Sequence, residues 1–259
     1  MTAASDAKSY RGRRPLRRLL QWLSKLAFWL VCDLEIEGAE NFPACGPLVV
    51  VGNHFSFLDP PIMVRISPIP MEFIGGALFP HAPRIVHFIP RLWGYLPVYR
   101  GTGSRFALQE GEKVLNKGGV LALFPEAGAW AEILRPGRPG AAFLSSRTQT
   151  RLLPVGIDGL PDVFPMLRRG RRARVRVKIG KPFGPCPPAG QDRAGRKTLD
   201  QFTSEIMERL AALIPAEKGG VYSSDPAVRD AARGSELYPW RETRETKDLY
   251  EAPDLTVKS

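Results

Sequence analysis

The chain has 259 residues and is 44% hydrophobic, which is enough to bury a core and indicates a globular protein of one large domain or two small ones. Its formal net charge of +11 predicts attraction to polyanions. Charge alone does not tell whether the polyanion is nucleic acid, anionic lipid or an anionic substrate. The three cysteines, an odd number with no CxxC or Cys/His spacing, argue against a disulfide framework or a zinc site and fit a reducing cytosolic setting.

The first predicted element is a helix over residues 15–32. Its polar residues form one narrow arc, and leucines and aromatic residues cover the rest of its surface. The arc consists of Arg17, Arg18, Gln21, Ser24 and Lys25. The uninterrupted apolar run from Leu26 to Cys32 is far shorter than the roughly 20 residues of a spanning helix, so the pattern predicts a basic amphipathic helix in a membrane interface. Two alternatives stay open: an ordinary helix that covers the core, and a signal peptide, although no small-residue cleavage site follows.

Downstream, short apolar runs alternate with helical or turn-rich stretches, which predicts an α/β fold with a mixed, mainly buried sheet flanked by helices. The runs 47–51 and 120–124 are continuously apolar, as in strands buried on both faces. In residues 174–179, apolar and basic residues alternate, which predicts a half-exposed strand with a basic side. Further strands are expected at 34–37, 71–74 and 152–157, and helices at 105–116 and 198–213.

Composition divides the chain into a membrane-associating segment (1–33), a folded domain (34–215) and a polar tail (216–259). The tail is expected because apolar periodicity fades after Pro215, which favours a partly disordered or surface-lying segment. A second basic group runs from Arg168 to Lys181, and from charge patterning alone it is either a solvated face or a polyanion site.

The most informative motif is the run from Gly52 to Pro60, directly after an apolar strand. Strand ends are where α/β proteins place working groups. Four residues separate His54 from Asp59, so a turn or first helical turn brings the carboxylate to one imidazole nitrogen and leaves the other free to accept a proton from a hydroxyl. This predicts a base and its orienting carboxylate, with a substrate hydroxyl in place of an enzyme serine. A capping or structural pair is the alternative.

Three further blocks follow in order along the chain. They are Trp93 to Gly101, with Arg100 at the end of an apolar stretch; Leu123 to Gly128, with Glu126 after a buried strand; and Leu153 to Ile157. Together with the His54 block they resemble the four sequence blocks of the glycerolipid acyltransferases, the family of 1-acylglycerol-3-phosphate acyltransferases. The resemblance covers residues 34–184.

The resemblance implies an O-acyltransferase in which His54 and Asp59 are catalytic and Arg100 binds the acceptor's phosphate. It also implies that Glu126 and Gly128 belong to the acceptor site. One block departs from the family, which usually has Phe-Pro-Glu-Gly-Thr-Arg-Ser where this chain has Phe-Pro-Glu-Ala-Gly-Ala-Trp. The second phosphate-binding arginine is therefore missing from this block.

Two nearby arginines, Arg135 and Arg138, are candidates to replace that missing charge. Otherwise the acceptor is not a simple phosphomonoester. Either way, the altered block predicts that this chain departs from its family in how it holds the acceptor.

The expected reaction moves a fatty acyl group from acyl-CoA or acyl carrier protein to a lysophosphatidate-like acceptor in phospholipid biosynthesis, with no metal or other cofactor. The expected place is the cytoplasmic face of a membrane with anionic lipid, as a peripheral or monotopic protein. Alternatives are acylation of another lyso-lipid, glycerol 3-phosphate or a glycolipid alcohol, and a catalytically idle membrane-binding relative. Nucleic acid is not expected, since no known binding module accompanies the basic run. The sequence makes no prediction of oligomeric state.

Overall fold

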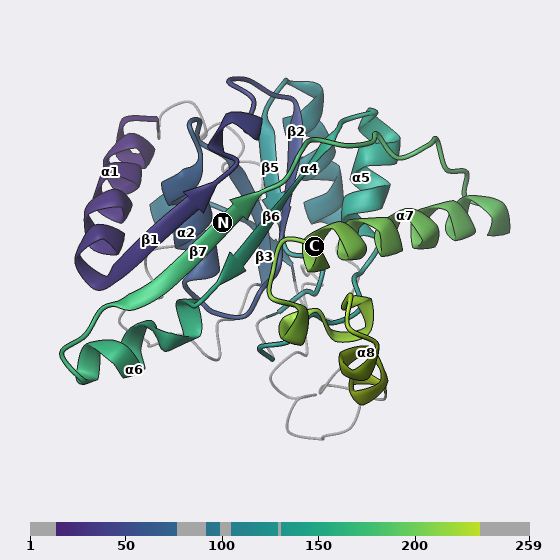
Figure 1. The fold of residues 1–259 in the computed structure, drawn as a ribbon. Helices are drawn as coiled ribbons and strands as arrows, with labels where there is room; N and C mark the ends of the chain where they lie inside the picture. The colour runs from purple at the N-terminus through teal and green to yellow at the C-terminus, as the bar shows by residue number, and fades with distance from the viewer. Residues whose placement is uncertain (1–13, 77–91, 99–104, 129–130, 234–259) are drawn as a thin grey trace, which may run out of the picture.

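The computed structural model describes residues 14–76, 92–98, 105–128 and 131–233, and its centre is a mixed sheet (Figure 1). In the described part of the chain the strands are β1 (Cys32–Glu37), β2 (Leu48–Gly52), β3 (Glu72–Gly76), β4 (Leu96–Val98), β5 (Val120–Leu123), β6 (Leu152–Asp158) and β7 (Ala173–Ile179). Their order in the sheet is β1-β7-β6-β2-β5-β3-β4. All neighbouring pairs are parallel except β6 with β7, so β1 and β7 run against the other five strands.

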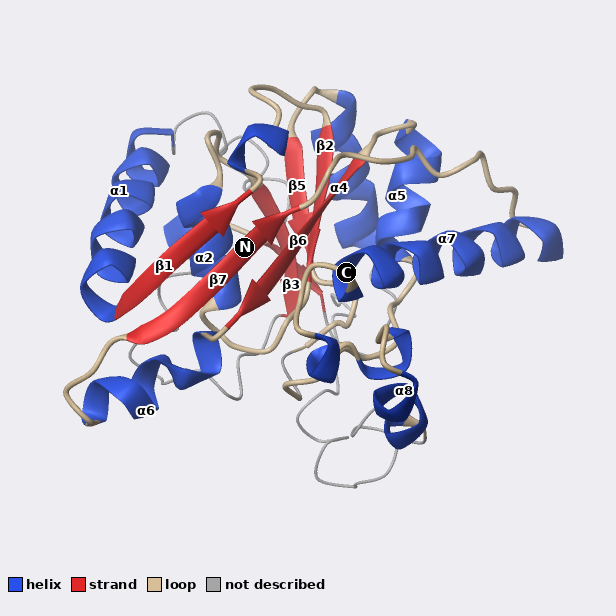
Figure 2. Cartoon of the chain, viewed as in Figure 1, coloured by secondary structure: helices blue, strands red, loops and turns tan. Residues whose placement is uncertain are grey.

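Helices cover both faces of this sheet, as the sequence predicts for the α/β class (Figure 2). The described helices are α1 (Arg14–Val31), α2 (Asp59–Ile66), α4 (Arg105–Asn116), α5 (Gly140–Thr148), α6 (Val163–Arg168), α7 (Arg193–Ala211) and α8 (Pro226–Ala232). Apolar residues of α1 and α2 pack on one face, and those of α4, α5 and α7 pack on the other. In β2, Val50 joins the first cluster while Val49 and Val51 join the second, so a central strand is apolar throughout because both of its faces are buried.

The helix α1 contacts the protein through its polar arc. The guanidinium of Arg17 is buried and donates to both carboxylate oxygens of Glu72, one bond being 2.7 Å long, and to the carbonyl of Trp93 at 2.9 Å. Gln21 donates to the carbonyl of Ser67, and Ser24 donates to that of Pro61. These contacts hold α1 against α2 and the start of β3.

The apolar side of α1 is consequently turned outward. The exposed side chains are Leu19, Trp22, Leu23, Leu26, Trp29 and Leu30, and Trp29 is 66% exposed. Phe28 alone among the large apolar residues of this helix is fully buried. The predicted helix is therefore present, but it does not cover the core with its apolar face. In the described ranges, no helix has the length and apolarity that crossing a membrane would require.

The exposed basic side of β7 is paired across the sheet with acidic residues of β1. Asp33 lies 3.2 Å from Arg172, Glu35 bonds to both Arg174 and Arg176, and Glu37 lies 3.5 Å from Lys178. The alternating pattern predicted for residues 174–179 is confirmed, and the ladder shows that much of this basic strand is neutralised locally.

The packed part of the chain continues beyond Pro215. Residues 216–222 form two short 3-10 turns, and α8 packs on the second of them. The ammonium of Lys218 lies 2.6 Å from the Asp158 carboxylate, and the Lys218 carbonyl accepts a hydrogen bond from Leu134. The predicted tail (216–259) thus includes a folded portion to residue 233, and its remainder lies outside the described residues.

Candidate active site

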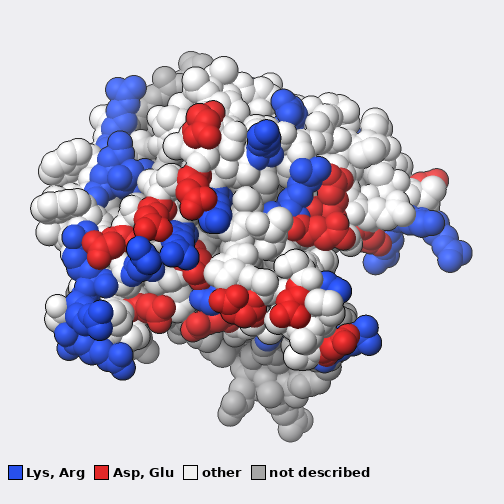
Figure 3. All heavy atoms as spheres, viewed as in Figure 1, with Lys and Arg blue, Asp and Glu red and all other residues white. Residues whose placement is uncertain are grey.

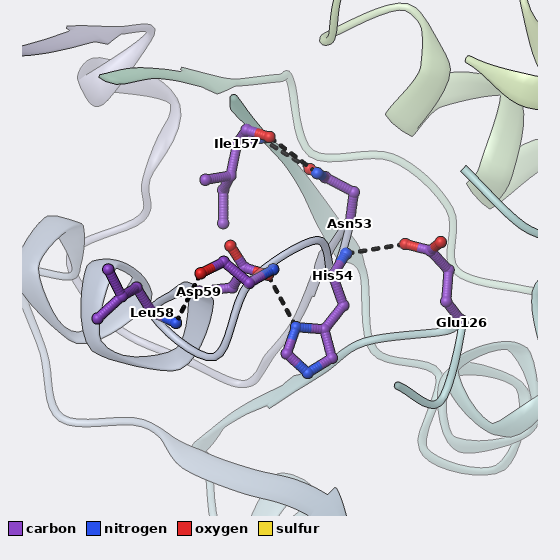
Figure 4. A network of polar contacts seen from close by, with 7 residues as sticks. Asn53, His54, Leu58, Asp59, Glu126 and Ile157 are labelled. Carbon is purple, nitrogen blue, oxygen red and sulfur yellow. Dashed lines mark hydrogen bonds and ion pairs between the residues drawn. The ribbon is translucent and has the colours of Figure 1, made fainter. Parts of the chain in front are cut away.

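The site lies where the parallel strands β2, β5 and β6 end. The loop of residues 53–58, called the His54 loop below, joins β2 to α2. Its first residue, Asn53, is fully buried, and its amide bonds to both the N–H and the carbonyl of Ile157 in β6, at 2.7 and 2.8 Å (Figure 4). These paired bonds fix the start of the loop to the neighbouring strand.

The predicted pair of His54 and Asp59 is in contact. Asp59 is the first residue of α2, and its Oδ2 lies 2.8 Å from Nδ1 of His54. The backbone N–H of Ser56 donates to the same oxygen at 2.8 Å. The imidazole also stacks on the ring of Phe124, with centroids 4.3 Å apart. The ring is therefore held from two sides, and its Nε2 makes no hydrogen bond to any described residue.

Burial separates the two members of this pair. The Asp59 side chain is 1% exposed, whereas that of His54 is 14% exposed, so the imidazole is the member that a substrate can reach. Burial raises the pKa of Asp59, and the hydrogen bonds from His54 and from the backbone of Ser56 and Phe55 oppose that rise. A buried carboxylate that only accepts hydrogen bonds holds a proton on Nδ1, which leaves Nε2 as the acceptor.

Glu126 supports the His54 loop from the end of β5. Its Oε1 accepts the backbone N–H of His54 at 2.8 Å (Figure 4). Its Oε2 accepts the backbone N–H of Arg135 at 3.0 Å. The residue is 1% exposed. This geometry gives Glu126 a positioning role in the site, since both oxygens are occupied by backbone donors.

The other candidate residues lie around Glu126 or outside the described ranges. Gly128 is buried two residues after it. The backbone N–H of Arg138 donates to the carbonyl of Pro125 at 2.9 Å, so both Arg135 and Arg138 are tied to the altered block. Arg100 lies outside the described residues. In the parts of the chain that are described, no three His, Cys, Asp or Glu residues are grouped as metal ligands would be.

The altered block keeps an unusual backbone turn. Ala127 has φ of 60°, a left-handed conformation that glycine adopts without steric cost and that alanine adopts at a cost of about 1–2 kcal/mol. The family block that this segment resembles has glycine at the corresponding place. The left-handed conformation of Ala127 is one that such a glycine would adopt without this cost.

Two further site residues, Asn53 and Phe124, were given no role by the sequence reasoning. A signal was available for Asn53, because an amide directly after a continuously apolar strand is buried and must find partners. No local pattern distinguishes Phe124, whose stacking on His54 depends on the pairing of β2 with β5.

The raised pKa of the Glu126 carboxyl group predicts that the free energy of unfolding depends on pH. Burial raises the pKa of Glu126 from 4.5 to about 8, against the opposing bonds from His54 and Arg135. The folded state then binds this proton more tightly than the unfolded state, so its contribution to the free energy of unfolding falls as pH rises from about 5 to about 8. Glu126→Gln should flatten the dependence of the free energy of unfolding on pH in this window, as measured by urea denaturation at several pH values.

The matched control is Glu132→Gln, at an exposed glutamate, which should keep the original pH dependence. Unchanged pH dependence in Glu126→Gln would contradict this assignment.

Comparisons with known proteins agree with this geometry. The protein-family model described as Acyltransferase matches residues 33–158, which include His54, Asp59 and Glu126. A 1-acyl-sn-glycerol-3-phosphate acyltransferase of Borreliella burgdorferi is 24% identical over 147 residues, a match that covers 54% of this chain and 57% of that relative. The chain therefore spans little more than half the length of this relative.

A solved structure shares the fold. The crystal structure of the 1-acyl-sn-glycerophosphate acyltransferase PlsC from Thermotoga maritima has a TM-score of 0.54 to this chain at 25% identity, over 77% of this chain and 79% of that one. The matched region contains the histidine and carboxylate in contact at a strand end, inside a fold shared with this enzyme. By these comparisons the chain is similar to the 1-acyl-sn-glycerol-3-phosphate acyltransferases, and its residues 33–158 match the Acyltransferase family model.

Proposed function

We propose that the chain is an O-acyltransferase that moves a fatty acyl group from a thioester to the hydroxyl of a lysophosphatidate-like acceptor in phospholipid biosynthesis. The observation that carries this proposal is the 2.8 Å contact between Nδ1 of His54 and the buried carboxylate of Asp59. It leaves Nε2 of a fixed imidazole able to act as a base at this strand end. The names of the relatives support the acceptor class.

The proposed step needs no covalent enzyme intermediate. Nε2 of His54 takes the proton of the acceptor hydroxyl while that oxygen attacks the thioester carbonyl. The carbonyl oxygen becomes an oxyanion, the C–S bond then breaks, and the thiolate leaves with the proton that His54 returns. Asp59 stabilises the imidazolium while it exists and keeps the ring in the right tautomer. One C–O bond is formed and one C–S bond is broken, so atoms and charge balance.

The backbone contacts of the loop serve the same step. Asn53 and Glu126 hold the start of the His54 loop, and Phe124 stacks on the His54 ring. Because the imidazole is already oriented, less free energy is lost in ordering it when substrate binds. We propose that acyl-CoA or acyl carrier protein supplies the thioester, and turnover with each donor separates the two.

The acceptor's phosphate is proposed to bind Arg100, with Arg135 or Arg138 supplying a second positive charge. The backbones of the latter two are anchored beside Glu126, which supports their place near the acceptor. A guanidinium binds phosphate through paired hydrogen bonds, and such charge-assisted bonds are each worth about 1.5–3 kcal/mol. Arg100→Ala should therefore raise the KM for lysophosphatidate by about 10- to 100-fold and leave the donor KM nearly unchanged.

The test supplies purified protein with acyl-CoA and a mixture of lysophosphatidate, monoacylglycerol and glycerol 3-phosphate, and identifies products by mass spectrometry. Arg100→Lys is the matched variant, since it keeps the charge and loses the paired geometry; it should also be impaired. Preference for monoacylglycerol would overturn the phosphate acceptor and leave acyl transfer standing. No acyl transfer to any acceptor by a folded protein would overturn the reaction itself.

We further propose that α1 attaches the protein to the cytoplasmic face of a membrane as a peripheral or monotopic helix. Its outward apolar face supports this, and Trp22 and Trp29 are of the residue type that favours membrane interfaces. Deleting residues 1–32 would be a poor test, because it also removes Arg17, Phe28 and the first residue of β1 from the packed body. Flotation of the full chain with phosphatidylcholine vesicles is the better measurement, and a chain that fails to float would remove this attachment.

A further inference from the structure

A second basic and apolar surface projects from the sheet beside α1. We call it the α6 tip and define it as Phe164, Leu167, Arg168, Arg169 and Arg171, which belong to α6 and the turn before β7. All five are exposed, including Phe164 at 44% and Leu167 at 36%. Figure 3 shows basic side chains gathered at the corner of the molecule that α6 occupies.

The arginines of the α6 tip differ from those of the neighbouring strand. Arg174 and Arg176 are paired with Glu35 of β1, whereas none of the three tip arginines forms an ion pair with any residue that the structure describes. Three like charges next to two exposed apolar side chains are costly for stability and offer nothing to the core. The combination is typical of a surface that meets an anionic, partly apolar partner.

The position of the α6 tip links it to the active site. The helix α6 follows β6 and therefore lies at the sheet edge where the His54 loop emerges. Phe164 stacks on Phe57 of that loop, with ring centroids 5.6 Å apart. A partner that contacts Phe164 therefore lies next to Phe57, which belongs to the loop between His54 and Asp59.

The same surface continues into α1. Arg172, in the turn after the tip, donates hydrogen bonds to the carbonyls of Trp29 and Cys32 at the carboxyl end of that helix. The exposed side chains of Trp29 and Leu30 are found at this end. The guanidinium of Arg172, next to the α6 tip, therefore ties the turn before β7 to the carboxyl end of α1.

We propose that the α6 tip is a second membrane contact, which binds anionic lipid headgroups through Arg168, Arg169 and Arg171 and seats the His54 loop at the lipid surface. The inference rests on the membrane location proposed above. Guanidinium groups bind lipid phosphates through paired hydrogen bonds, while Phe164 and Leu167 enter the interface beside them. An acidic acyl carrier protein would match the charge, but the adjoining apolar face of α1 favours a lipid surface.

The experiment compares two variants of the full chain that lose the same charge. The tip variant is Arg168→Gln/Arg169→Gln/Arg171→Gln, and the matched control is Arg174→Gln/Arg176→Gln/Lys178→Gln. Each is floated with vesicles of phosphatidylcholine alone and of phosphatidylcholine with added phosphatidylglycerol. Each basic residue near an anionic surface strengthens binding to it, so the loss of all three should weaken binding of the tip variant to the anionic vesicles roughly 100-fold. It should bind neutral vesicles like the wild type, and the control should match the wild type on both.

Several outcomes would overturn the proposal. Equal losses in the tip and control variants would mean that only total charge matters, and an unchanged tip variant would mean that the tip does not bind lipid. A raised KM for acyl carrier protein thioester with unchanged vesicle binding would assign the tip to the donor protein instead. Acyl transfer to a short-chain, water-soluble lysophosphatidate is measured in parallel. If the wild type does not acylate this soluble substrate, the proposed reaction is wrong. The vesicle experiment tests the α6 tip independently of that result.

Discussion

His54→Ala is expected to lower kcat by at least about 10²- to 10⁴-fold, because general-base assistance to the acceptor hydroxyl is lost. The fold should survive, since the side chain is partly exposed and, among the described residues, hydrogen-bonds only to Asp59. Steady-state acyl transfer measures the loss, and circular dichroism checks the fold. Asp59→Asn should be severely impaired as well, since an amide can hold the ring in the wrong tautomer, and such changes cost about 10⁴-fold in triad enzymes.

The matched control is Ser56→Ala in the same loop. The Ser56 hydroxyl accepts a hydrogen bond from the N–H of Leu58, and the bond from Ser56 to Asp59 comes from its backbone N–H, so the hydroxyl does not hold the His54–Asp59 pair. Ser56→Ala should therefore keep most activity, which also tests that no serine nucleophile acts here. Near-normal turnover of folded His54→Ala would remove the mechanism proposed above.

Arg17→Met is expected to lower the free energy of unfolding by about 3–5 kcal/mol, because it leaves the buried Glu72 carboxylate without its partner. The substitution also removes the bond to the Trp93 carbonyl and the packing of the guanidinium over the Trp93 ring, 5.3 Å from its centroid. Urea denaturation measures the difference. Adding Glu72→Gln to Arg17→Met should recover part of the loss, since no buried charge then remains.

The neighbouring Arg18 provides the control for this experiment. It is exposed and has no ion pair among the described residues, so Arg18→Met should change the free energy of unfolding by less than about 0.5 kcal/mol. If Arg17→Met behaved like Arg18→Met, α1 would have to be held by its other contacts. The pair of variants thus measures how firmly α1 is fixed to the rest of the packed protein.

Elements whose causes are local could be predicted from the sequence. The helix predicted at 105–116 has those bounds in α4, since an amphipathic period ends at two glycines. The contact of His54 with Asp59 was predictable for the same reason, because the two residues are five positions apart and one turn brings their side chains together. The start of α7 was predicted at residue 198 and lies at Arg193, five residues earlier. There Asp192 caps the helix through the N–H of Gly195, but the first turn carries no apolar face to reveal it.

Features that join distant segments could not be predicted. The polar arc of α1 was visible in the sequence, but its inward orientation depends on Glu72, Ser67 and Pro61, which lie dozens of residues away. The role of Glu126 likewise depends on bonds to the backbone of His54, 72 positions earlier. The backbone donors that Glu126 accepts carry no side-chain signature, so no pattern of residue types could have indicated them.

The charge ladder between β1 and β7 has a consequence for self-assembly. β1 is an outer strand of the sheet, and outer strands invite pairing with a strand of another molecule. Within one chain, Glu35 and Glu37 meet bases of β7, and Asp33 meets Arg172 directly before that strand. If the β1 strands of two copies paired at their open edges, Asp33, Glu35 and Glu37 would lie beside acids of the other copy as well as beside their own basic partners. Like charges in opposed positions are destabilising. The acids of β1 therefore disfavour such pairing in addition to neutralising the neighbouring basic strand.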